Sequence, residues 1–164
     1  MDYSKLYSLI LEYKFSIVRE IKGNRNGVFR KNHYSNNVGM VRLFQKGSPV
    51  VEGLKMKKNN RAIYNECKRL YPNHKFTGIM INKNFQCDPH KDNGNEGPVI
   101  IIGLGNYTGG ELVAEGIEYN IRNKDLKFEA SKIEHYVKPF EGDRYSVVLF
   151  KHKNCNYEEI EELL

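Results

Sequence analysis

The chain has 164 residues, of which 40% are hydrophobic and 28% are charged, and its formal net charge is +6. These values are ordinary for a single globular domain with a sizeable core, and they exclude collagen-like, disulfide-scaffold and membrane-spanning classes. The three cysteines lack paired spacing, no apolar run approaches bilayer length, and the first residues lack a signal-peptide pattern. We therefore expect a soluble, intracellular protein of the cytoplasm or nucleus, with reduced thiols and no membrane partner.

Two helices and one strand are predicted in the first half of the chain. Residues 3–21 place apolar side chains three and four positions apart, the pattern of an amphipathic helix that packs on a sheet. Gly23 and the Asn- and Gly-containing run after it end this helix. A strand is expected over residues 37–44. A second helix is expected over roughly residues 60–71, with Pro72 just past its end.

From Phe76 onward the pattern changes to short β-rich runs divided by Gly, Asn and Pro. The predicted strands cover residues 76–83, 98–104, 110–114, 117–121, 126–129, 132–139 and 144–151. Helices followed by many short strands indicate an α+β fold whose sheet rolls into a barrel or sandwich. We expect one domain over residues 1–164, with helical support in 1–75 and the barrel in 76–151.

A candidate metal site lies at the end of one predicted strand. His90 and Asp92 are two residues apart, so they point to the same face of an extended segment. Pro89 and the Asn- and Gly-rich loop after Asp92 place the pair at a strand end. The third ligand must come from another strand, and His135 is the natural choice. Two histidines and one carboxylate on one face of Fe(II) leave its other positions open.

A candidate anion site follows the last histidine. Residues 139–143 are predicted to turn, so that Arg144 begins a strand running back antiparallel to the strand of His135. Ser146, two residues on, shares the face of Arg144. A guanidinium can hold a carboxylate through two parallel hydrogen bonds, which a lysine cannot reproduce. The hairpin thus predicts a carboxylate anchor beside the metal.

His90-x-Asp92, His135 and Arg144-x-Ser146 together resemble the motif set of the Fe(II)- and 2-oxoglutarate-dependent dioxygenases. The resemblance covers about residues 76–151, and it implies a double-stranded β-helix, a cupin-like jelly roll, braced by the N-terminal helices. It implies that His90, Asp92 and His135 are the iron ligands. It also implies that Arg144, assisted by Ser146, binds the distal carboxylate of the co-substrate 2-oxoglutarate.

Two further stretches resemble parts of the same family. The strand before the His-x-Asp pair ends at Asn82, whose side chain is a candidate contact of 2-oxoglutarate, or else a strand-end cap. The run from Tyr107 to Leu112 contains Gly109 and Gly110, which we interpret as turn residues and not as a phosphate loop, because no helix follows them. The family resemblance implies an oxidoreductase that uses Fe(II), 2-oxoglutarate and O₂ to hydroxylate a substrate C–H bond.

The substrate is predicted less directly than the chemistry. Residues 1–75 hold 16 Lys and Arg against 5 Asp and Glu, a net charge of +11, which suits a nucleic acid or reflects a solvated cationic face. The strand set most resembles the TET/JBP-like branch, which implies oxidation of a methyl group on a nucleic-acid base. Candidate contacts to the phosphate backbone are Lys55, Lys57, Lys58 and Arg61. Tyr34, Tyr64 and Phe85 could stack on a base, although aromatic residues of this kind more often lie in a core.

Two other functions remain open at this stage. One is a protein hydroxylase of the prolyl type, whose partner is a protein or peptide. The other is a jelly-roll module that binds without turnover, although the complete motif set argues against it.

Overall fold

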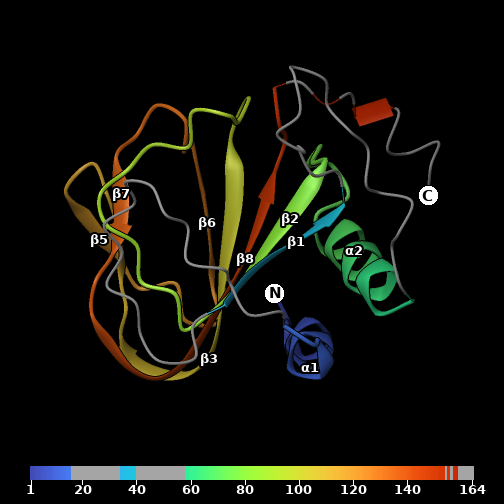
Figure 1. Cartoon of the computed structure of the whole chain (residues 1–164), viewed down its shortest axis with the longest axis horizontal. Helices are drawn as coiled ribbons and strands as arrows, with labels where there is room; N and C mark the ends of the chain where they lie inside the picture. Colours follow the sequence, from blue (N-terminus) through green and yellow to red (C-terminus); the bar gives the residue numbers. More distant parts are fainter. Residues whose placement is uncertain (16–33, 40–57, 154, 156, 159–164) are drawn as a thin grey trace.

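The computed structural model describes residues 1–15, 34–39, 58–153, 155, 157 and 158 (Figure 1). Two helices and eight strands lie in these ranges. They are α1 (Ser4–Glu12), β1 (Tyr34–Gly39), α2 (Lys58–Leu70), β2 (Gly78–Lys83), β3 (Val99–Gly109), β4 (Leu112–Ala114), β5 (Ile117–Tyr119), β6 (Asp125–Phe128), β7 (His135–Val137) and β8 (Phe140–Phe150). None of the helices in this part of the chain has the length and apolar character needed to span a bilayer.

The strands form two antiparallel sheets. The large sheet has five strands in the order β1-β2-β8-β3-β6, and the small sheet has three in the order β5-β4-β7. The segment that follows β2 extends the small sheet, because His90 and His135 form a β-bridge. From β2 onward the chain passes back and forth between the two sheets, which is the arrangement of a double-stranded β-helix. The predicted jelly-roll fold is therefore confirmed.

The large sheet has two different faces because side chains alternate along each strand. On β8, Tyr145, Val147 and Leu149 pack into the core shared with the helices, whereas Val148 packs into the core between the two sheets. The helices α1 and α2 lie on one side of the large sheet, and β5 and β7 lie on the other (Figure 1). Arg144 and Ser146 have the parity of Val148, so they face the barrel interior.

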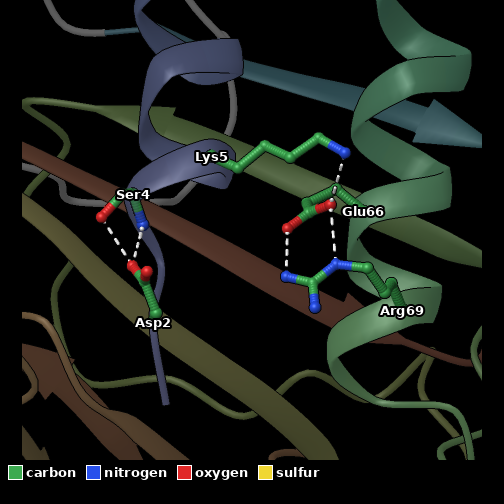
Figure 2. Close-up of polar contacts among 5 residues, drawn as sticks. All are labelled: Asp2, Ser4, Lys5, Glu66 and Arg69. Carbon is green, nitrogen blue, oxygen red and sulfur yellow. Dashed lines mark hydrogen bonds and ion pairs between the residues drawn. The ribbon is translucent and has the colours of Figure 1, made fainter.

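The two helices pack side by side through apolar and polar contacts. Leu6 and Ile10 of α1 are fully buried, and burying an aliphatic side chain of this size contributes ~1.5–3 kcal/mol. Glu66 of α2 accepts hydrogen bonds from Arg69 and lies 3.3 Å from the Lys5 ammonium (Figure 2). These hydrogen bonds, and the one with Lys5, hold the pKa of Glu66 below its usual value although burial opposes them.

The predicted first helix is too long. The periodic pattern suggested residues 3–21, but α1 ends at Glu12, and Tyr13 turns to an extended conformation with ψ of 130°. The rings of Tyr13 and Phe15 pack edge to face at 4.9 Å, and Phe15 also packs against Tyr34 and Tyr145 of the large sheet, so tertiary packing overrides the helical period. Residues 16–21 of the predicted helix and residues 40–44 of the predicted strand lie outside the described residues. The second helix is confirmed.

The predicted hairpin from His135 to Arg144 is wrong. β8 begins at Phe140, so Arg144 lies inside a strand, and β7 pairs with β4 whereas β8 pairs with β2 and β3. Gly142 has a φ of +93°, and a Cβ there would lie 2.4 Å from the Asn106 carbonyl oxygen. This glycine therefore allows close approach of two strands and is not part of a turn.

Candidate iron and co-substrate site

The three predicted metal ligands converge at one end of the barrel. His90 and Asp92 come from the segment after β2, and His135 is the first residue of β7. One ligand atom from each residue lies within 4.8 Å of the others. The Nε2 atoms of His90 and His135 each lie 3.4 Å from a different oxygen of the Asp92 carboxylate. Two imidazoles and one carboxylate in this arrangement are a donor set suited to Fe(II).

Main-chain carbonyls orient both imidazole rings. The Nδ1 of His90 lies 2.7 Å from the carbonyl oxygen of Asp88, and the Nδ1 of His135 lies 2.9 Å from that of Ile133. A carbonyl oxygen accepts only, so each Nδ1 carries a hydrogen and donates it. In its neutral form each ring therefore presents the Nε2 lone pair to a metal, the tautomer that a histidine ligand requires.

Backbone hydrogen bonds hold the ligands in register. His90 and His135 each donate their N–H to the carbonyl of the other, at 3.1 and 3.0 Å, and the Asp92 N–H donates to the carbonyl of Ala130 at 2.9 Å. The edge of the Phe128 ring faces His135, with 5.0 Å between the ring centroids. The ligands are thus fixed by the sheet before any ion binds.

The Asp92 carboxylate and the His90 imidazole perturb one another. The hydrogen bond with Asp92, together with that to Cys87, raises the pKa of His90 to about 10 although burial opposes the shift. Burial alone would raise the pKa of Asp92, but hydrogen bonds from His135 and His90 outweigh it and hold that pKa well below its usual value. A divalent cation bound by these three side chains would replace the proton that Asp92 shares with the imidazoles, so metal binding would release protons.

Arg144 is a buried cation inside the barrel. Its exposed fraction is 2%, and its guanidinium lies 5.6 and 5.8 Å from the ring centroids of Tyr107 and Phe140. Its Nε donates to the Gly110 carbonyl at 3.1 Å. The buried Nη2 finds no hydrogen-bond acceptor among the described residues. A buried, unpaired donor is costly, by ~1–3 kcal/mol and more for a charged group, so this nitrogen is suited to a bound anion.

Ser146 and Asn82 lie on the same inner face as Arg144. Their backbones pair across β8 and β2, and Asn82 Nδ2 donates to Ser146 Oγ at 3.0 Å. Ser146 faces Gly103 on the other side, and the space over Gly103 holds Ile121 and the Tyr107 hydroxyl. The predicted co-substrate residues are therefore neighbours, and their role in binding stays a prediction.

The sequence reasoning missed two contributors to this interior. The Tyr107 hydroxyl is buried without a hydrogen-bond partner among the described residues, and it would lie 2.9 Å from a Cβ on Gly103. Gly110, predicted as a turn residue, has a φ of +69°, and a Cβ there would lie 2.9 Å from the Arg144 Cδ. Extending the strand of Gly103 by period two would have placed Tyr107 on the inner face.

The residues predicted to contact a nucleic acid lie in different environments. Tyr64 is 1% exposed in the core between α2 and the large sheet, so of its two readings the core one is confirmed and stacking on a base is ruled out. Its position on α2 follows the apolar helical period, which explains its burial. Tyr34 packs against Phe15 on the helix side of the sheet. Lys55, Lys57 and the side chain of Lys58 lie outside the described residues.

Comparisons with solved structures agree with this geometry. A 2OG-Fe(II) oxygenase family oxidoreductase from Burkholderia pseudomallei aligns with a TM-score of 0.59 and 18% identity, over 87% of this chain and 73% of that one. NgTET1 in complex with 5mC DNA aligns with a TM-score of 0.58 and 17% identity, over 73% of this chain and 61% of that one. The chain has the 2OG-Fe(II) oxygenase fold.

The oxygenase fold is shared at low identity, and the aligned region spans less than two thirds of NgTET1. No family model matches the sequence, and no curated protein matches it either. The resemblance drawn from the five motif residues is nevertheless confirmed at the level of the fold.

Proposed function

We propose that this chain is an Fe(II)- and 2-oxoglutarate-dependent dioxygenase that hydroxylates a substrate C–H bond. One observation carries the proposal: a two-histidine, one-carboxylate cluster and a buried guanidinium with an unpartnered Nη2 share the interior of one oxygenase-type barrel. The cluster fits a divalent metal, and the guanidinium fits the far carboxylate of a dicarboxylic 2-oxo acid. A jelly roll that only binds a ligand has no need for both.

The side chains of this chain then have separable roles. His90, Asp92 and His135 hold the metal through two Nε2 atoms and one carboxylate. Bound Fe(II) supplies the activation of O₂ that couples decarboxylation of 2-oxoglutarate to hydroxylation. Arg144 neutralises and orients the distal carboxylate, and Ser146 and Asn82 assist it. The overall reaction consumes one 2-oxoglutarate and one O₂, and gives succinate, CO₂ and one hydroxyl on the substrate.

For the substrate class we propose a methyl group on a nucleic-acid base. The net charge of +11 over residues 1–75 supports this class, because phosphate backbones are bound through cationic side chains. NgTET1, which shares the fold, is a protein in complex with 5mC DNA. Affinity for an oligonucleotide should then fall steeply as the salt concentration rises.

Succinate release tests the chemistry and the substrate together. Purified protein with Fe(II), 2-oxoglutarate and O₂ is screened against methylated DNA, methylated RNA, Pro-containing peptides and small molecules. We expect stimulation by a methylated oligonucleotide, and none in His90→Ala. Turnover in the His90 variant at the wild-type rate would refute the metal assignment. Stimulation by peptides alone would replace the nucleic-acid substrate with a protein one.

A further inference from the structure

A row of hydrogen-bonded side chains crosses the inner face of the large sheet. Ser35 of β1 pairs with Asn82 of β2, which pairs with Ser146 of β8. The side chains follow the same path: Ser35 Oγ donates to Asn82 Oδ1 at 2.7 Å, and Asn82 Nδ2 donates to Ser146 Oγ at 3.0 Å. The row therefore connects the edge strand β1 to Ser146, which lies two positions from Arg144 on β8.

The row has a direction because a hydroxyl carries only one hydrogen. Ser35 gives its hydrogen to the amide oxygen of Asn82, which is a stronger acceptor than the Met80 sulfur 3.0 Å away. The Asn82 amide group then occupies a lone pair of the Ser146 oxygen. The Ser146 hydrogen is left over, and it points away from Asn82.

Among the described residues, Asn82 and Gly103 flank Ser146 across the sheet and Arg144 is its neighbour on the same face of β8, so the hydrogen is free to point toward Arg144. Ser146 is buried, and its other neighbour on the sheet is Gly103, which offers no side chain. The space over Gly103 holds Ile121 and the Tyr107 hydroxyl, and both that hydroxyl and Arg144 Nη2 lack a hydrogen-bond partner among the described residues. The Ser146 hydroxyl and Arg144 Nη2 are thus two donors on one face of β8, a pair suited to a carboxylate.

We propose that Ser35 and Asn82 are positioning residues that turn the Ser146 hydroxyl into a donor toward the distal carboxylate of the co-substrate. The inference rests on the proposed function, because it assumes that a dicarboxylic 2-oxo acid occupies the barrel. Asn82 acts through Ser146 and does not itself need to touch the ligand. The edge strand β1, outside the metal-bearing part of the fold, thereby contributes to co-substrate affinity.

Titration of 2-oxoglutarate into the protein tests this proposal without turnover. Mn(II) replaces Fe(II) under anaerobic conditions, and dissociation constants are measured for the wild type and for a double-mutant cycle of Ser35→Ala and Ser146→Ala. Loss of one hydrogen bond to a charged ligand predicts roughly tenfold weaker binding for Ser146→Ala. Ser35→Ala alone should weaken binding roughly threefold, and it should have no further effect in the Ser146→Ala background.

A second variant separates hydrogen-bond direction from charge. Asn82→Asp keeps the shape but can only accept, so it draws the Ser146 hydrogen away from the pocket. The added negative charge weakens 2-oxoglutarate binding whether or not Ser146 is present. The extra loss of affinity seen with Ser146, compared with the Ser146→Ala background, therefore measures the hydrogen-bond direction alone. We expect that excess to be roughly tenfold. Ser4→Ala on α1, whose hydroxyl contacts only Asp2 among the described residues, is the matched control.

The outcomes distinguish this inference from the proposed function. Wild-type protein that does not bind 2-oxoglutarate would overturn the proposed function, and the inference with it. Wild-type binding with unchanged or tighter binding in Ser35→Ala would overturn only the inference, because in a row running the opposite way the Ser146 hydrogen is already donated to the Asn82 amide oxygen, and removing Ser35 takes no donor from the pocket. In turnover assays the positioning role predicts a raised KM for 2-oxoglutarate with kcat nearly unchanged, a split that general destabilisation would not produce.

Discussion

Replacing Arg144 by Met should separate ligand binding from stability. Met fills much of the volume of the arginine side chain but carries neither charge nor donor. Removing the guanidinium relieves the cost of an unpartnered, buried Nη2, and it also removes the hydrogen bond to the Gly110 carbonyl and the contacts with Tyr107 and Phe140. The buried, unpaired donor costs ~1–3 kcal/mol, and the lost hydrogen bond is worth ~1 kcal/mol. Each of the two cation–π contacts of this desolvated guanidinium is worth ~2 kcal/mol.

These terms oppose one another, so the free energy of unfolding without ligand should fall by ~2–4 kcal/mol. The response to ligand is a separate quantity. At a 2-oxoglutarate concentration 100 times its Kd, binding stabilises the wild type by ~2.7 kcal/mol. For a chain of this length, that stabilisation raises the Tm by roughly 5–11 °C. The variant should lose nearly all of this increase.

Thermal unfolding with Mn(II), with and without 2-oxoglutarate, measures both quantities in one experiment. Arg61→Met is the matched control, because Arg61 is an exposed residue of α2 on the opposite side of the large sheet. The control should keep the full ligand-dependent rise in Tm. If Arg144→Met kept that rise as well, the distal carboxylate would not bind where we place it.

Three further predictions concern other parts of the structure. Gly110→Ala should weaken 2-oxoglutarate binding and lower the stability, because the added Cβ would press on the Arg144 side chain. Gly116→Ala is the control: Gly116 also has a positive φ, but an added Cβ would have nothing within 4 Å. This control should lower the stability by ~1 kcal/mol and leave the Kd for 2-oxoglutarate unchanged. Asp92→Asn should lower Mn(II) affinity in equilibrium titrations, since a neutral amide replaces the only anionic ligand, and wild-type affinity would contradict the assignment. Glu66→Gln should lower the free energy of unfolding at pH 7 by ~1.5–3 kcal/mol. Folding lowers the pKa of Glu66, so the ionised carboxylate stabilises the folded state fully above its unfolded pKa of 4.5, and this stabilisation is lost as the pH falls through the folded pKa. The urea unfolding midpoint of the variant should therefore depend less on pH in that acidic range. An equal acid dependence in both proteins would contradict the role of the contacts in Figure 2.

The convergence of the three proposed metal ligands was predictable because part of their arrangement is local. His90 and Asp92 share a face through the strand period alone, and the same period places Arg144 and Ser146 together. His135 could be selected because a third ligand had to come from a separate strand. In each case a short-range rule determined which side chains face the barrel interior.

The partners of each strand were not predictable in the same way. A hairpin between β7 and β8 is the simplest reading of two consecutive strands, but β7 pairs with β4 and β8 with β2 and β3. Pairing over long sequence distances depends on how both sheets close, and no single segment records it. The contact between Ser35 and Asn82 spans 47 positions, so neither residue alone indicated the other.

The carbonyls that orient the two imidazoles have a consequence for how this site can vary. In each case the acceptor belongs to the residue two positions before the histidine, and it is a main-chain atom. Substituting the side chain of Asp88 or Ile133 cannot delete that acceptor, as it could if a carboxylate side chain oriented the ring. The tripeptides 88–90 and 133–135 are therefore self-contained units for presenting an imidazole. A designer could transplant them into another paired-strand scaffold with their ring orientation intact, and the surrounding sequence could diverge widely while the metal-binding tautomers persist.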